Sequence, residues 1–162
     1  MSIIMLGVGD IGVAKIEDLA VKTMALGSCV SVIIYDPYTH LVGMDHIALP
    51  ESKINLKKAE EKPGYFADSG IPVLIEMMKS RGMRIPLNRT IVKLVGGARV
   101  MDLNNTFNIG KRNVLAIKKI LWSYGMGAVA EDIGGTISRT VTAFSENGIV
   151  QISVPGQPIW EI

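Results

Sequence analysis

The sequence has few of the residues that form covalent or metal cross-links: its 162 residues include one cysteine and two histidines. A single cysteine excludes an intramolecular disulfide framework and a cysteine-rich zinc site. With so few histidines, a metal site would consist mostly of carboxylates, and no carboxylate cluster suggests one. We therefore expect no metal and no cofactor. A chain of this length needs neither for stability, because folding buries roughly two-thirds of its unfolded surface.

Strong net charge and long hydrophobic runs are also missing. The formal charge is +2 and the basic residues are scattered, which gives nucleic-acid binding little support. No apolar run comes close to the roughly 18 residues that a membrane-spanning helix needs. The apolar residues 1–6 lack a preceding basic segment and are followed by Gly7 and Gly9, unlike a signal peptide. We expect a cytoplasmic protein of one domain, residues 1–162, with no membrane insertion.

Hydrophobic periodicity predicts a mixed α+β fold. A helix is expected from an N-cap at Asp68 or Ser69 to about Arg81, and a second amphipathic helix over 112–124 with Trp122 on its apolar stripe. A loop is expected over 103–109. Alternating or continuous apolar segments predict strands at 11–17, 21–25, 30–35, 41–49, 91–95, 128–133, 138–144 and 149–154.

The one cysteine and one of the histidines flank a predicted hairpin. Cys29 precedes the strand 30–35, Asp36 and Pro37 supply turn chemistry, and His46 lies towards the end of the next strand. In an antiparallel pair those two ends lie side by side. A histidine beside a cysteine can generate the thiolate that attacks carbonyl carbon. The pattern therefore predicts a nucleophile–base pair.

A competing motif lies near the N-terminus, where residues 7–12 read GVGDIG and match the G-x-G-x-x-G fingerprint of dinucleotide-binding domains. Asp36 lies roughly where that fold places its ribose-binding acid. However, residues 11–25 lack a helical apolar stripe, and Pro37 makes Asp36 a typical turn residue. We interpret the glycines as turn residues and the dinucleotide domain as the weaker alternative.

Several short motifs, each weak alone, occur in a specific order and spacing. They are LGSCV at 26–30, YDP at 35–37, HIALP at 46–50, DSG at 68–70, KLVGGA at 93–98, IGKRNV at 109–114 and AEDIGG at 130–135. With these motifs the chain resembles the CheD family, the bacterial and archaeal chemoreceptor glutamine deamidases.

The resemblance implies a catalytic triad of Cys29 as nucleophile, His46 as base and Thr23 as the third member. It implies an α/β sandwich in which β-sheet layers pack with two main helices, similar to toxin-type Cys-His deamidases. The implied activity is that of a hydrolase, a protein-glutamine glutaminase. It would convert glutamines in the cytoplasmic domains of chemotaxis receptors to glutamate through a thioester. The implied partner is a CheC-type phosphatase.

A second hypothesis, from a different functional class, remains open. The chain could be a non-enzymatic regulatory partner of a CheC-type phosphatase, with an incidental cysteine. A lone cysteine at a strand start is usually a small buried apolar side chain. A histidine on an apolar strand is usually a core residue with its hydrogen bonds satisfied. Only the joint pattern of Thr23, Cys29 and His46 favours the enzyme.

Overall fold

The structure is a computed structural model that describes residues 1–99 and 108–162. Its strands are β1 (Ile3–Leu6), β2 (Ile11–Ala14), β3 (Ala20–Leu26), β4 (Val30–Asp36), β5 (Leu41–Ile47), β6 (Ile91–Gly96), β7 (Ala128–Ile133), β8 (Arg139–Phe144), β9 (Val150–Ser153) and β10 (Trp160–Glu161). Its α-helices are α1 (Leu56–Glu61), α2 (Ala67–Ser80) and α3 (Ile109–Ser123), and its short 3₁₀ turns are η1 (Ser52–Ile54), η2 (Pro63–Tyr65) and η3 (Leu87–Arg89).

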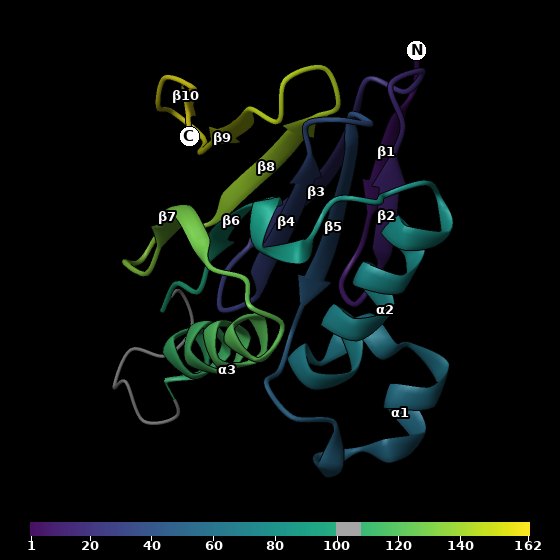
Figure 1. Ribbon diagram of the computed structural model, residues 1–162. Coiled ribbons are helices and arrows are strands. Elements are labelled where there is room, and N and C mark those ends of the chain that lie inside the picture. The colour runs from purple at the N-terminus through teal and green to yellow at the C-terminus, as the bar shows by residue number, and fades with distance from the viewer. Residues whose placement is uncertain (100–107) are drawn as a thin grey trace.

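The strands form two five-stranded sheets, in the orders β1-β3-β8-β9-β10 and β2-β5-β4-β6-β7. The two longer helices, α2 and α3, cover one face of the second sheet (Figure 1). One apolar cluster fills the space between these helices and the sheet, and another fills the space between the two sheets. The predicted α+β sandwich with two main helices is confirmed.

The predicted hairpin is present as β4 and β5. Both strands are buried along their whole length, as expected of apolar strands that are covered on both faces. Their turn depends on Asp36, whose carboxylate accepts hydrogen bonds from the Tyr38 N–H at 2.9 Å and the Thr39 hydroxyl at 2.6 Å. The antiparallel register pairs Ser31 with His46, which places the ends of the two strands side by side as predicted.

The predicted N-cap of α2 is wrong. The helix begins at Ala67, and no side chain caps it. Asp68 instead accepts a hydrogen bond from the Ser52 N–H at 2.9 Å, and Ser69 donates to the Pro63 carbonyl at 2.6 Å. Both polar side chains therefore attach the preceding segment to the helix rather than satisfying the first turn.

Helix α3 begins at Ile109, three residues before the predicted start, so the end of the predicted loop is helical. Asn108 directly precedes the helix. Residues 103–107 of the predicted loop lie outside the described residues. The predicted apolar position of Trp122 is wrong, since this side chain is 72% exposed. The buried positions Val114, Ile117 and Leu121 recur every three or four residues, and the next residue points away from that stripe.

Strands β1 and β10 lie outside the predicted elements. Both are short and lie at the two edges of their sheet, where β1 pairs with β3 and β10 pairs with β9. Strands of four and two residues give too little periodicity to distinguish them from a turn or tail.

Candidate active site

The three residues of the implied triad come from both sheets. Cys29 immediately precedes β4, His46 lies on β5 and Thr23 lies on β3 of the facing sheet. Alternate residues of a strand share a face, so Cys29 shares the face of Ser31, which pairs with His46. The register therefore places Cys29 diagonally across the strand pair from His46, on the same face of the sheet. Thr23 and His46 are buried, and Cys29 is partly exposed.

Thr23 and His46 are joined across the two sheets by a short hydrogen bond. The Oγ1 of Thr23 lies 2.6 Å from Nδ1 of His46, and the same hydroxyl donates to the carbonyl oxygen of Leu6 at 3.0 Å. A hydroxyl has one hydrogen. Because that hydrogen goes to Leu6, Thr23 accepts from Nδ1–H of His46. This fixes the tautomer in which Nε2 is unprotonated.

His46 is held in its neutral form by its surroundings. Burial lowers the pKa of its imidazole from 6.5 to about 4, and the carboxylate of Asp10 opposes this only in part. Asp10 forms an ion pair with Lys62 at 3.1 Å, which offsets its negative charge. Nε2 is buried and has no hydrogen-bond partner among the described residues. It is a free basic nitrogen between the two sheets.

Cys29 is a protonated thiol at neutral pH. Burial raises the pKa of Cys29, and a contact with its own backbone N–H lowers it by less. A neutral thiol and a neutral imidazole differ from a preformed thiolate–imidazolium pair. A neutral imidazole can accept the proton of a thiol at the moment the sulfur attacks, as a general base does.

The backbone around Cys29 offers hydrogen-bond donors. Within the described part of the chain, the N–H group of Ser28 donates to no acceptor, the N–H group of Cys29 contacts its own thiol, and both residues are partly exposed. Free backbone N–H groups beside a nucleophile are suited to bind the oxyanion of a tetrahedral intermediate.

The turn after β6 fixes the position of the Cys29 carbonyl. The N–H of Gly97 donates to that carbonyl at 2.9 Å, and the N–H of Ala98 donates to the carbonyl of Gly27 at 2.8 Å. Gly96 has a φ of 120°, and a Cβ there would collide with the Cys29 carbonyl oxygen. Both its conformation and its proximity to Cys29 require glycine.

Asn113 is a site residue for which sequence reasoning assigned no role. It is fully buried on α3, and its side-chain amide donates to the carbonyls of Ser28 and Ala48, each at 3.0 Å. These carbonyls lie beside Cys29 on one strand and just beyond His46 on the other. Asn113 therefore holds together the two chain segments that carry the thiol and the imidazole. The only signal in the sequence was its place in the motif IGKRNV.

The segment with the glycine fingerprint does not have the dinucleotide-binding structure. Its residues form a turn between β1 and β2, and β2 begins at Ile11, where the fingerprint requires a helix. Over residues 1–99 and 108–162, no three His, Cys, Asp or Glu side chains are grouped to hold a metal ion. None of the helices described there is long and apolar enough to cross a bilayer.

Residues 48–154 match the family described as CheD chemotactic sensory transduction. The chain belongs to the CheD family. Among its CheD relatives, a protein of Syntrophotalea carbinolica is 52% identical over 162 residues, 100% of both chains. One of Solibacter usitatus is 42% identical, covering 98% of this chain and 97% of the relative. One of Methanococcus maripaludis is 39% identical over 88% of each. All three are named probable chemoreceptor glutamine deamidase CheD.

Proposed function

We propose that this chain is a cytoplasmic chemoreceptor glutamine deamidase, a protein-glutamine glutaminase acting as one domain over residues 1–162. Cys29 is the nucleophile, His46 the general base and acid, and Thr23 the residue that orients His46. The names of the CheD relatives support the activity and substrate class. The observation that carries the residue roles is the Leu6–Thr23–His46 chain of hydrogen bonds, which leaves Nε2 of His46 unprotonated.

In the first half of the reaction, Sγ of Cys29 attacks the side-chain carbonyl carbon of glutamine while Nε2 of His46 takes the thiol proton. The carbonyl oxygen becomes an oxyanion, which the N–H groups of Ser28 and Cys29 bind. The C–N bond then breaks as Nε2 returns its proton to the nitrogen. Ammonia leaves, and a γ-glutamyl thioester to Cys29 remains.

In the second half, water attacks the thioester carbonyl while Nε2 of His46 takes a proton from it. The new tetrahedral intermediate collapses with cleavage of the C–S bond. Sulfur regains a proton from Nε2, and the substrate side chain leaves as glutamate. His46 therefore acts as base and acid once in each half, and Cys29 ends as the thiol with which it began.

Thr23 supports this cycle less strongly than a carboxylate would. Its hydroxyl fixes the tautomer and orientation of His46, but it carries no charge to stabilise the imidazolium that forms during attack. The low pKa of His46 also shows that the site stabilises the imidazolium poorly. We therefore expect a modest catalyst that depends on tight positioning of its glutamine.

Mass spectrometry of a purified receptor cytoplasmic domain tests the proposal, because each deamidation raises the mass. Cys29→Ala and His46→Gln are expected to lose at least about a thousandfold in rate. His40→Asn is a matched control, since His40 is the other histidine of the chain and lies outside the triad. A Cys29→Ala variant that deamidates as fast as the wild type would show that the mechanism is wrong.

A CheC-type phosphatase is the proposed binding partner, and family membership supports this. The non-enzymatic alternative predicts that Cys29→Ala binds the phosphatase as well as the wild type does and retains the full effect of the wild type on receptor adaptation. The enzymatic proposal predicts that Cys29→Ala keeps binding but loses that effect.

A further inference from the structure

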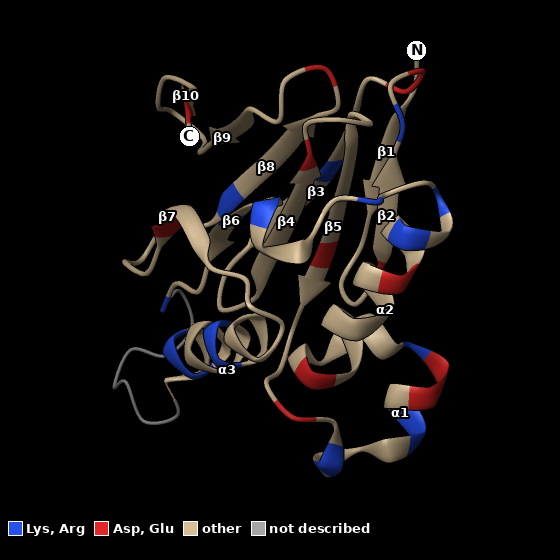
Figure 2. Ribbon diagram, viewed as in Figure 1, with Lys and Arg blue, Asp and Glu red and all other residues tan. Residues whose placement is uncertain are grey.

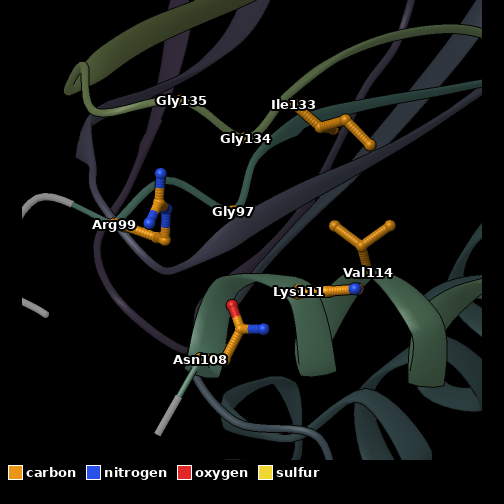
Figure 3. A pocket seen from close by; sticks show the side chains of 8 residues that line it. All are labelled: Gly97, Arg99, Asn108, Lys111, Val114, Ile133, Gly134 and Gly135. Carbon is orange, nitrogen blue, oxygen red and sulfur yellow. The ribbon is translucent and has the colours of Figure 1, made fainter. Parts of the chain in front are cut away.

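A pocket of about 300 Å³ opens between the first turns of α3 and the ends of β6 and β7. In Figure 3, Arg99 lies at one side of the opening, Asn108 lies at the start of α3, and Val114 points towards Ile133 at the other side. The pocket is lined by the residues that the figure labels, which are Gly97, Arg99, Asn108, Lys111, Val114, Ile133, Gly134 and Gly135.

This pocket shares a wall with the candidate active site. Gly97 lines it, and the N–H of Gly97 donates to the carbonyl of Cys29. Hydrogen bonds from Gly134 to Gly96 and from Arg99 to Gly135, each 2.9 Å long, join the two strand ends that form its rim. A group bound in the pocket would therefore lie near the backbone of Cys29.

The charged residues that line the pocket are all basic. Arg99 and Lys111 are exposed, and neither forms an ion pair with a residue that the structure describes. The first turn of α3 contains no acidic residue, and the N-terminal end of a helix dipole favours a negatively charged group. Figure 2 shows further Lys and Arg along α3, with the acidic residues of α1 on another part of the molecule.

The opposite end of the pocket is apolar, with the side chains of Val114 and Ile133. Two cations beside an apolar wall fit a carboxylate carried on methylene groups, as in a glutamate side chain, better than a fully hydrated inorganic anion. Such a carboxylate can be close to the reacting glutamine, because residues three or four apart on a helix lie about 5–6 Å from each other.

We propose that this pocket binds an acidic side chain of the substrate protein that lies within one helical turn of the glutamine attacked by Cys29. Arg99 and Lys111 are then specificity-determining residues, which select glutamines with an acidic neighbour. This inference rests on the proposed deamidase function and adds to it the kind of sequence that the enzyme selects.

The test uses the cytoplasmic domain of a chemoreceptor that the wild-type chain deamidates, with the modified glutamines mapped by mass spectrometry. Each Asp or Glu within one turn of a modified glutamine is replaced by Ala. We then compare kcat/KM for the wild type, for Arg99→Ala/Lys111→Ala and for Lys57→Ala/Arg84→Ala. The last is a matched control with the same loss of charge at exposed residues outside the pocket.

The wild type and the control are expected to lose about three- to tenfold in kcat/KM when the acidic neighbour is removed, mainly through KM. On the intact substrate, Arg99→Ala/Lys111→Ala is expected to have a kcat/KM about three- to tenfold below that of the wild type. Removing the acidic neighbour from the substrate should not lower the kcat/KM of this variant further. Added salt should reduce the difference. A general effect on folding would instead lower activity equally on both substrates.

Three results would overturn the proposed role of the pocket. The modified glutamines could lack an acidic neighbour, or Arg99→Ala/Lys111→Ala could have the same kcat/KM as the wild type. Alternatively, removing the acidic neighbour could lower the kcat/KM of both double variants equally. Failure of the proposed function has a different signature. In that case Cys29→Ala deamidates as well as the wild type, whatever the pocket variants do.

Discussion

Asp45 and His46 are consecutive residues of β5 with buried, titratable side chains that face opposite layers of the fold. His46 faces the other sheet, where Thr23 binds one of its nitrogens. Asp45 faces the helices, close to Gly64 and Gly70, and neither of its carboxyl oxygens has a hydrogen-bond partner among the described residues. Burial lowers the pKa of His46 and raises that of Asp45 well above its usual value.

The comparison shows that burial shifts both pKa values towards the neutral form, whereas a hydrogen bond gives His46 a fixed tautomer. The raised pKa of Asp45 favours its protonated form, and no hydrogen bond among the described residues orients that proton. His46 also has no opposite charge in contact with it among the described residues, but its hydrogen bond to Thr23 determines which ring nitrogen is basic. The difference predicts that changes around His46 alter catalysis and that changes at Asp45 alter stability.

Among substitutions that leave Cys29 and His46 in place, the largest effect is expected from Thr23→Val, which removes the acceptor for Nδ1–H of His46 while preserving shape. Deamidation should slow by about a hundredfold, because His46 loses its fixed tautomer and its orientation. Thr23→Ser, which keeps the hydroxyl, should retain most of the activity. Rate measurements on a receptor domain check both, and equal rates for Val and Ser would mean that the hydroxyl has no role.

Asp45→Asn should change the pH dependence of stability and leave deamidation intact. The folded state holds the Asp45 proton above pH 3.8, where the unfolded state has released it. The stability due to the neutral acid is thus lost as pH rises towards the folded-state pKa. In that range the free energy of unfolding falls by about 1.4 kcal/mol per pH unit, and Asp45→Asn removes this slope. Urea unfolding of the wild type and of Asp45→Asn from pH 4 to 8 measures this slope. If the free energy of unfolding depends on pH in the same way in both proteins, the prediction is wrong.

The pH profile of activity gives a smaller but distinct signal from His46. Its pKa of about 4 means that the base stays neutral well below pH 6.5. The acid limb of kcat/KM should therefore fall well below pH 6.5. Stability should decline as pH falls from 6.5 towards 4, because only the unfolded state gains the proton there. In His46→Gln the stability decline due to this group should disappear; an acid limb near pH 6.5 in the wild type would contradict the burial argument.

Ser31→Ala should have the smallest effect. Ser31 pairs across the sheet with His46, and its buried hydroxyl has no partner in the described part of the chain. Removing an unsatisfied hydroxyl is nearly neutral or slightly stabilising, within about 0.5 kcal/mol. Thermal unfolding and the deamidation rate should both match the wild type. A large loss of activity would give Ser31 a role in the site that its geometry does not indicate.

The sequence predicted the β4–β5 hairpin well, because a continuous apolar strand, an Asp-Pro turn and a second apolar strand are all local signals. That hairpin was enough to place Cys29 and His46 at the same end of one strand pair. The contact of Thr23 with His46 depends on how two sheets pack, which no local pattern encodes, so only the family resemblance pointed to Thr23. The bonds of Asn113 to Ser28 and Ala48 span 85 and 65 residues, and no local signal in the sequence assigned them.

The hydrogen bond from Thr23 to the Leu6 carbonyl connects the proposed base, His46, to the beginning of the chain. Leu6 lies on β1, an edge strand of four residues that pairs only with β3. The next residues also bond to the backbone of His46, through Gly9 N–H at 2.8 Å and the Asp10 carbonyl at 3.1 Å. A fusion partner, a proteolytic cut or a register slip at this edge would thus change which nitrogen of the His46 imidazole carries the proton, while most of the core remained folded. The first ten residues therefore help to hold the imidazole that we propose as the base.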